Sequence, residues 1–164
     1  MKRGKKAVSA IIATVLLILL TVAAAGVLYS FMVPLIRGTI ETADKCNAAQ
    51  LEIIEGEDTC YSSSQQNVSV EVGRGGQDVE LNGIRILVSG KDKSKSVIAR
   101  SSSLPGKNEA RVYIISTSDL GTAPEKVSIA ALVNVSGKDR LCETTSQTYL
   151  AACSKALLVG ERIQ

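Results

Sequence analysis

The sequence predicts an α+β fold, in which one long hydrophobic helix precedes an antiparallel β-sandwich. Two observations lead to this prediction. No charged residue occurs between Ala7 and Ile36, a run of 30 residues. From Leu51 onward, apolar and polar residues alternate with a period of two, which is typical of half-buried strands. The change of pattern divides the chain into a helical part and a β part.

The uncharged run is long enough to cross a membrane. A spanning helix needs about 20 residues, whereas the apolar region of a cleaved secretory signal has about 7–15. Four basic residues precede the run: Lys2, Arg3, Lys5 and Lys6. The positive-inside rule therefore places the amino terminus in the cytoplasm and the chain from about residue 38 outside. Tyr29 and Phe31 suit the outer interface, and Pro34 either kinks the helix or marks its exit.

The expected helix is apolar on every side, so it must lie in lipid or among other apolar helices. Its small residues are unevenly distributed, because at 100° per residue six of them fall within about one third of the circumference. They are Ala10, Ala13, Thr14, Thr21, Ala24 and Ala25. Small residues let helix backbones approach closely. Since Leu17 and Leu28 interrupt the stripe, it is either a packing face or a by-product of alanine-rich composition.

The composition argues against an enzyme and against a nucleic-acid-binding protein. The chain has no histidine, the commonest proton-transfer group near neutral pH, and the sequence shows no nucleophile paired with a base. The net charge of +3 comes from the four amino-terminal basic residues, and the remaining 15 basic and 16 acidic residues leave a charge of −1. A near-neutral body gives no electrostatic reason to bind nucleic acid. We expect no catalytic residue, no metal and no cofactor.

The β part is expected to form one core over residues 51–164, with residues 37–50 as a weak helical extension or connector. The clearest strands are NVSVEV at 67–72, RVYII at 111–115 and KVSIAALVNV at 126–135. Asn82-Gly83 interrupts the alternation between 78 and 88 and predicts either a tight turn or a bulge. GRGG at 73–76 is interpreted as a hairpin turn, since it precedes no helix that could bind phosphate. The tail from residue 156 is expected to add a last strand.

The cysteines all follow the apolar run and predict two disulfides. They are Cys46, Cys60, Cys142 and Cys153. An even number in a small external domain favours disulfides, and the absence of CxxC spacing makes a zinc site unexpected. Three pairings are possible. We favour pairing between sequence neighbours, Cys46 with Cys60 and Cys142 with Cys153, and the alternative to disulfides is four free buried thiols. The Cys46–Cys60 bond would close a loop of about 15 residues worth about 3 kcal/mol, and the Cys142–Cys153 loop is similar.

Two sequons could carry N-linked glycans. They are Asn67-Val68-Ser69 and Asn134-Val135-Ser136. The alternative for each is that the asparagine lies at a strand end and bonds to its own turn.

The amino-terminal stretch KKAVSAIIATVLLILL resembles that of archaeal type IV pilins, which belong to the archaellin and pilin superfamily and carry a class III signal peptide. Lys5, Lys6 and Ala7 match the end of the basic leader. The start of the helix is matched by Val8, Ser9, Ile11, Ile12, Ala13 and Thr14. Bacterial pilins usually have glutamate in place of Ile12, which archaeal members commonly lack, and many archaeal members have proline in place of Ala10.

The resemblance implies processing by a membrane prepilin peptidase between Ala7 and Val8. This cut would remove the leader, residues 1–7, and retain the helix, residues 8–36. The resemblance also implies an Ig-like or pilin-like sandwich and a structural subunit of an extracellular pilus-like filament, used for adhesion. Its partners would be the membrane before assembly, the pilus assembly machinery and other copies of the chain, joined through the helix.

Two other functions stay open. A single-span membrane anchor carrying an external β domain would act as a binding module and keep its leader. An archaellin of a motility filament belongs to the same superfamily, although this chain lacks the glycine-rich helix start usual in archaellins.

Overall fold

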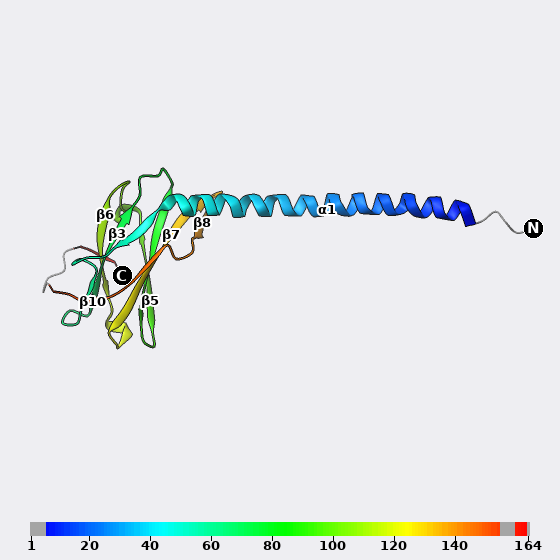
Figure 1. Ribbon diagram of the computed structural model, residues 1–164. Coiled ribbons are helices and arrows are strands. Elements are labelled where there is room, and N and C mark those ends of the chain that lie inside the picture. The colour runs from blue at the N-terminus through cyan, green and yellow to red at the C-terminus, as the bar shows by residue number, and fades with distance from the viewer. Residues whose placement is uncertain (1–5, 155–159, 164) are drawn as a thin grey trace, which may run out of the picture. The chain divides into compact units, whose positions relative to one another are not determined.

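The computed structural model describes residues 6–154 and 160–163, with only the backbone for residues 6–10 and 101. The chain forms two units, Met1–Ile40 and Glu41–Gln164. The first unit contains most of helix α1, and the second contains its last turns and the strands; Figure 1 labels α1 and several of the strands. The elements are α1 (Lys6–Ala49), β1 (Leu51–Ile54), β2 (Cys60–Ser62), β3 (Asn67–Arg74), β4 (Leu81–Gly90), β5 (Ser94–Arg100), η1 (Ser101–Ser103), β6 (Ala110–Ser116), η2 (Ser118–Leu120), β7 (Pro124–Val135), β8 (Lys138–Leu141), β9 (Ser146–Tyr149), β10 (Ala151–Ala152) and β11 (Glu161–Ile163).

Helix α1 continues through the segment expected to be a weak extension or connector and ends at Ala49. Pro34 lies inside it and does not end it. The next residue, Gln50, has a φ of 42°, a left-handed conformation that commonly terminates helices. The carbonyl of Gln50 accepts the Gly75 N–H at 3.0 Å, so the helix end is bonded to the end of β3. A Cβ at Gly75 would lie 2.7 Å from the Gln50 Cβ, closer than Cβ atoms approach in proteins, which favours glycine there.

The strands form two sheets. In one sheet the order is β10-β2-β3-β6-β11, with β1 also paired to β3, and in the other it is β5-β4-β7-β8, with β9 also paired to β7. Most neighbours are antiparallel, as predicted, but β10 pairs with β2 and β11 pairs with β6 in parallel. Strand β11 confirms the expected last strand in the tail.

Both sheets contribute to one hydrophobic core. Alternating residues of β3, β4 and β7 supply a large part of it: Val68, Val70, Val72, Ile84, Ile86, Val88, Val127, Ile129, Ala131 and Val133 are buried. Period-two patterning thus placed one face of each strand inward, as a sandwich requires. The structure confirms the α+β class and the sandwich arrangement predicted from the sequence.

Two local predictions have different outcomes. The pairing of β4 with β7 shifts register between Leu81 and Gly83, so Asn82-Gly83 forms a bulge and not a turn. The interpretation of GRGG as a hairpin turn is wrong, because β3 continues to Arg74 and the chain then crosses to β4 in the other sheet. The Arg74 guanidinium donates to the carbonyls of Val79 and Pro105, which holds this crossing in place.

Tyr113 is the largest fully buried side chain and predicts a loss of stability at high pH. Its hydroxyl donates to the Ser103 carbonyl, and burial raises the pKa of Tyr113 to about 12. A tyrosine in the unfolded chain ionises near pH 10, so the folded state disfavours the phenolate. The neutral phenol contributes its full stabilisation below pH 10, and this contribution is lost as the pH rises from 10 to about 12. Over that window, the free energy of unfolding should fall by about 2–3 kcal/mol.

Urea unfolding of the detergent-solubilised chain at several pH values between 9 and 12 would measure this loss. The control is Tyr113→Phe, which keeps the ring but has no ionisable hydroxyl. The variant should start less stable, because it lacks the bond to Ser103, and should then decline less steeply. Parallel curves for the two proteins would contradict the assignment.

Candidate functional site: the apolar surface of helix α1

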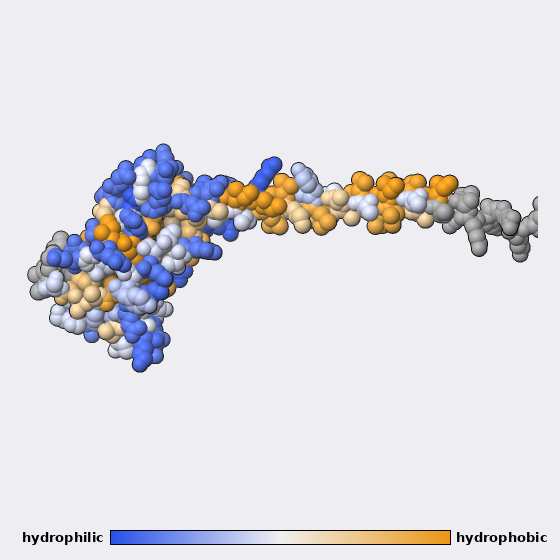
Figure 2. Space-filling model, in the orientation of Figure 1, coloured by the Kyte–Doolittle hydropathy of each residue, from blue (hydrophilic) through white to orange (hydrophobic). Residues whose placement is uncertain are grey.

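Helix α1 exposes large apolar side chains along most of its length. Between Ile11 and Ile40 these side chains are 51–71% exposed. Leu16–Leu20 are five consecutive aliphatic residues, and at 100° per residue they occupy every side of the helix. Figure 2 shows apolar residues along the visible side of this helix, whereas most of the visible β-unit surface is hydrophilic. Among the described residues, α1 is the one helix long and apolar enough to cross a membrane.

Three hydroxyl groups in the described part of the uncharged run are bonded within the helix. Thr14, Thr21 and Ser30 each donate to the carbonyl three residues earlier, at 2.8 Å. A hydroxyl left without a partner in lipid or in a helix bundle would be costly, and these bonds remove that cost. The helix can therefore be surrounded by apolar atoms on every side.

The proposed packing residues lie on this surface. Ala13, Thr14, Thr21, Ala24 and Ala25 are all exposed on α1, and Ala10 lies in the same helix with its side chain outside the described residues. Their use in helix packing stays a prediction.

The proposed processing site lies at the start of the helix. Lys5 falls outside the described residues, and Lys6, Ala7 and Val8 form the first helical positions. The first four N–H groups of a helix have no partner within it, so the first turn unwinds at little cost. A peptidase could therefore reach the Ala7–Val8 bond without disrupting the rest of α1, although cleavage itself stays a prediction.

The last turns of α1 are fixed to the β unit by polar contacts. Lys45 donates to the Asn134 carbonyl at 2.7 Å and pairs with Glu41 at 3.1 Å. Ser136 also lies 3.5 Å from a Glu41 oxygen, and Ala49 is fully buried. The turn between β7 and β8 is thereby attached to the helix end. Sequence reasoning missed the contact between Lys45 and Asn134, because the two residues are 89 positions apart and the group that Lys45 bonds is a backbone carbonyl.

Asp139, in β8 just after the same turn, makes two further contacts. The Asp139 carboxylate accepts from the Asn82 amide at 2.7 Å and pairs with Arg100 at 3.0 Å. These contacts, the Asn82 hydrogen bond above all, lower the pKa of Asp139. Strands β4, β5 and β8 are thus connected at one corner of their sheet.

The structure contains two disulfides, as predicted, but the favoured pairing is wrong. Cys46 bonds to Cys142 and Cys60 bonds to Cys153. The reason lies in the sheet topology: β10 runs beside β2, with Ala151 opposite Cys60, and brings Cys153 next to the strand. The Cys153 N–H also donates to the Tyr61 carbonyl at 3.0 Å. Both bonds therefore connect the start of the β unit to its carboxyl-terminal part.

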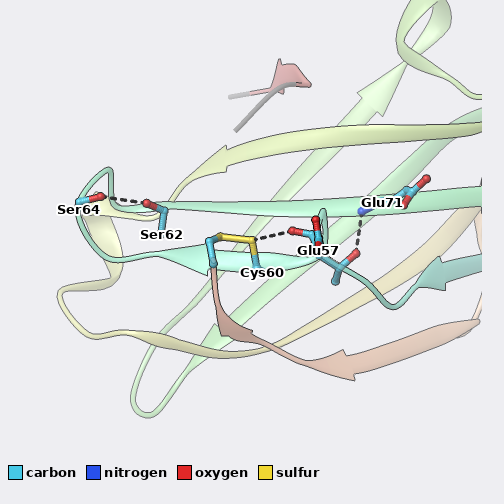
Figure 3. The surroundings of a disulfide bond; sticks show 7 residues. Glu57, Cys60, Ser62, Ser64 and Glu71 are labelled. Carbon is cyan, nitrogen blue, oxygen red and sulfur yellow. Dashed lines mark hydrogen bonds between the residues drawn. A yellow bond between two sulfur atoms is a disulfide. The ribbon is translucent and has the colours of Figure 1, made fainter. Parts of the chain in front are cut away.

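Figure 3 shows the surroundings of the Cys60 disulfide. The Cys60 sulfur lies 3.4 Å from the Glu57 carbonyl oxygen. The neighbouring Thr59 hydroxyl donates to the Ile54 carbonyl at 2.6 Å and accepts the Glu71 N–H at 3.1 Å. These bonds fix the turn between β1 and β2 and so position Cys60 for its partner.

The two sequons lie in different surroundings. Asn67 begins β3, and the sequon serine, Ser69, is buried between β2 and β6. Asn134 lies near the end of β7, where its side-chain oxygen accepts the Gly137 N–H at 2.9 Å, and Ser136 is exposed in the turn. Asn134 thus makes the turn bond expected of the alternative interpretation. Glycosylation of both sequons stays a prediction.

Comparison of the chain with protein-family models, with curated proteins and with solved structures found no match. An apolar helix at the amino terminus suggests a membrane anchor or a signal, and two disulfides suggest an extracellular domain.

Proposed function

We propose that the chain is a structural subunit of an extracellular type IV pilus-like filament of the archaeal kind. The precursor lies in the cell membrane with its amino terminus in the cytoplasm and its β unit outside. A prepilin peptidase removes residues 1–7, and the assembly machinery then packs the helices of many copies together. The β units cover the filament and contact surfaces or neighbouring cells, while the chain itself catalyses no reaction.

The observation that supports this proposal is the surface of α1, which has no charge from Ala7 to Ile36 and is apolar on every side. An isolated helix of this kind is stable only in an apolar environment. Lipid provides that environment before assembly, and neighbouring helices provide it afterwards. Burial at about 25 cal/mol per Å² would strongly oppose the release of a subunit into water.

A single-span anchor is the second candidate, because α1 is also long enough to cross a bilayer once. The two candidate functions predict different amino termini for the mature chain. A filament subunit should be cut after Ala7, whereas an anchored binding module should keep its leader.

The experiment is to image the cells of origin by electron microscopy with and without this protein and to measure the mass of the mature chain. We expect surface filaments that disappear with the protein and an amino terminus at Val8. Cells that swim normally but lose attachment would separate a pilin from an archaellin. A mature amino terminus at Met1, together with no change in filaments, would contradict the proposal and favour the anchor.

A further inference from the structure

The β unit has a hollow where the end of β3 meets the start of β1 and β6. Its volume is about 440 Å³, within the range of about 300–1,000 Å³ typical of small-molecule sites. Its floor follows the register of the sheet, in which Gly73 of β3 lies between Glu52 of β1 and Ala110 of β6. Leu51 and Ile53 are buried in the core, and successive strand residues point to opposite faces. The hollow therefore lies on the outer face of the sheet, where a ligand can reach it.

Two glycines of the GRGG stretch keep the hollow free of side chains. A Cβ at Gly73 would lie 3.2 Å from the Ile54 Cδ1 atom, so a side chain there would occupy the floor. A Cβ at Gly75 would lie 2.7 Å from the Gln50 Cβ atom at one wall. Neither glycine has a positive φ, so the backbone conformation does not require glycine at either position. The glycines, which do not form a hairpin turn, thus leave room beside the side chains that line the hollow.

Three polar side chains around the hollow are available to a ligand. Gln50 and Asn108 supply amide groups and Glu52 supplies a carboxylate, and all three residues are exposed. Among the hydrogen bonds and ion pairs of the described residues, none uses these three groups. The Glu109 carboxylate, in contrast, already accepts the Gly106 N–H at 2.6 Å. The hollow therefore offers two amides and one carboxylate whose hydrogen-bonding capacity is unused within the protein.

The backbone of both walls is bonded to β3. On one side the Gly75 N–H donates to the Gln50 carbonyl at 3.0 Å. On the other side the Arg74 N–H donates to the carbonyl of Glu109, the residue after Asn108, also at 3.0 Å. Groups that are held in place before a ligand arrives lose less conformational freedom on binding. These bonds therefore suit the hollow to recognition of a ligand.

The chemistry of the available groups favours a neutral saccharide. An amide and a sugar hydroxyl can each donate and accept, and a carboxylate accepts from further hydroxyls. Ile54 and Ala110 add apolar surface, against which the C–H groups of a sugar ring can pack. An anion is disfavoured, because the guanidinium of Arg74 is bonded to the carbonyls of Val79 and Pro105. A metal ion is disfavoured too, because the described residues contain no group of three acidic, cysteine or histidine side chains that could hold one.

We propose that the hollow at the end of β3 binds a neutral saccharide unit of a surface glycan. The proposal rests on the proposed function, in which the β units contact surfaces or neighbouring cells, and it gives that contact a ligand class. The amides of Gln50 and Asn108 bond to hydroxyl groups of the sugar from two sides, and the Glu52 carboxylate accepts from another hydroxyl.

An oligosaccharide array tests the ligand class. The detergent-solubilised full-length chain is applied to immobilised neutral, N-acetylated and acidic oligosaccharides, and calorimetry then measures the affinity for the best of them in solution. We expect binding to uncharged oligosaccharides, with or without N-acetyl groups. Binding to acidic oligosaccharides alone, or to none on the array, would overturn the proposal.

Two substitutions test the residues of the hollow. Gln50 and Asn108 have φ values of 42° and 55°, a left-handed conformation that glycine adopts without strain. Gln50→Gly and Asn108→Gly should therefore still fold and form both disulfides, but each should weaken saccharide binding about tenfold or more. The matched control is Gln66→Gly, which replaces the same residue type at a φ of 51° and lies at the opposite end of β3. The control should bind normally. Unchanged affinity in both variants of the hollow, or an equal loss in the control, would overturn the proposal.

The binding measurement uses the single subunit and does not depend on filaments. A chain that forms filaments but binds no saccharide would overturn this inference and leave the filament function intact. A chain that binds a saccharide through Gln50 and Asn108 but forms no filaments would overturn the filament function and assign the hollow to an anchored binding module.

Discussion

Removing the Cys46–Cys142 disulfide by replacing both cysteines with serine should lower the free energy of unfolding by about 3.5 kcal/mol. The bond joins residues 96 apart, and an isolated crosslink of that span is worth about 4.7 kcal/mol in the chain-entropy model. The second bond reduces this value. With Cys60–Cys153 intact, the shortest covalent path between the two positions runs through that bond and contains only about 25 residues.

The overlap of the two bonds makes their effects non-additive. Removal of either bond alone should cost about 3.5 kcal/mol, but removal of both should cost about 8 kcal/mol, because the bond lost second closes a loop of more than 90 residues. Small domains are stable by only about 5–15 kcal/mol, so the quadruple variant should be partly or wholly unfolded.

Urea unfolding of the detergent-solubilised chain measures these differences, and peptide mapping without reduction confirms the pairing in the unaltered protein. An exposed serine-to-alanine change in the β unit, Ser94→Ala, serves as the control and should change stability little. Additive losses near 3 kcal/mol, with peptides linking Cys46 to Cys60, would instead support the pairing of sequence neighbours.

The sequence predicted the parts of the fold that depend on local pattern. The uncharged run predicted α1, and the alternation of Val68, Val70 and Val72 predicted the buried face of β3, because side-chain direction in a strand follows from position alone. The disulfide pairing depends on which strands become neighbours. Closeness in sequence favoured a bond between Cys60 and Cys46. The parallel pairing of β10 with β2 instead brings Cys153 beside Cys60, and these two residues form the bond.

The candidate site was predictable only in part for the same reason. Composition identified the apolar surface of α1 without any knowledge of its neighbours. The attachment of its last turns was not visible, because Lys45 donates to a backbone carbonyl, and every residue other than proline presents the same N–H and C=O groups. The hairpin turn predicted for GRGG, residues 73–76, was wrong because glycines indicate a change of direction but not which sheet the next strand joins.

Replacing Leu17 by lysine should abolish filaments while leaving the chain in the membrane. Leu17 is exposed about one third of the way along the uncharged run. After the change, Ile18–Ile36 still offers 19 uncharged residues, close to the roughly 20 that a span requires. The helix can therefore shift in the bilayer and bring the ammonium group toward the cytoplasmic interface, where a lysine is tolerated.

A filament core allows no such shift, because the position of each helix is fixed by its neighbours. The ammonium group would be buried among apolar side chains, and a lysine at the centre of a membrane helix already costs about 3 kcal/mol. Every subunit would carry this cost, so assembly should fail completely. Leu17→Ile, which keeps an aliphatic side chain of the same volume, is the matched control and should assemble normally. Membrane fractionation and electron microscopy together separate the two functions. For Leu17→Lys, a single-span anchor predicts little change in either measurement, whereas a filament subunit predicts that the chain stays in the membrane and that filaments are lost. Filaments of normal number from Leu17→Lys would contradict a core built from this helix.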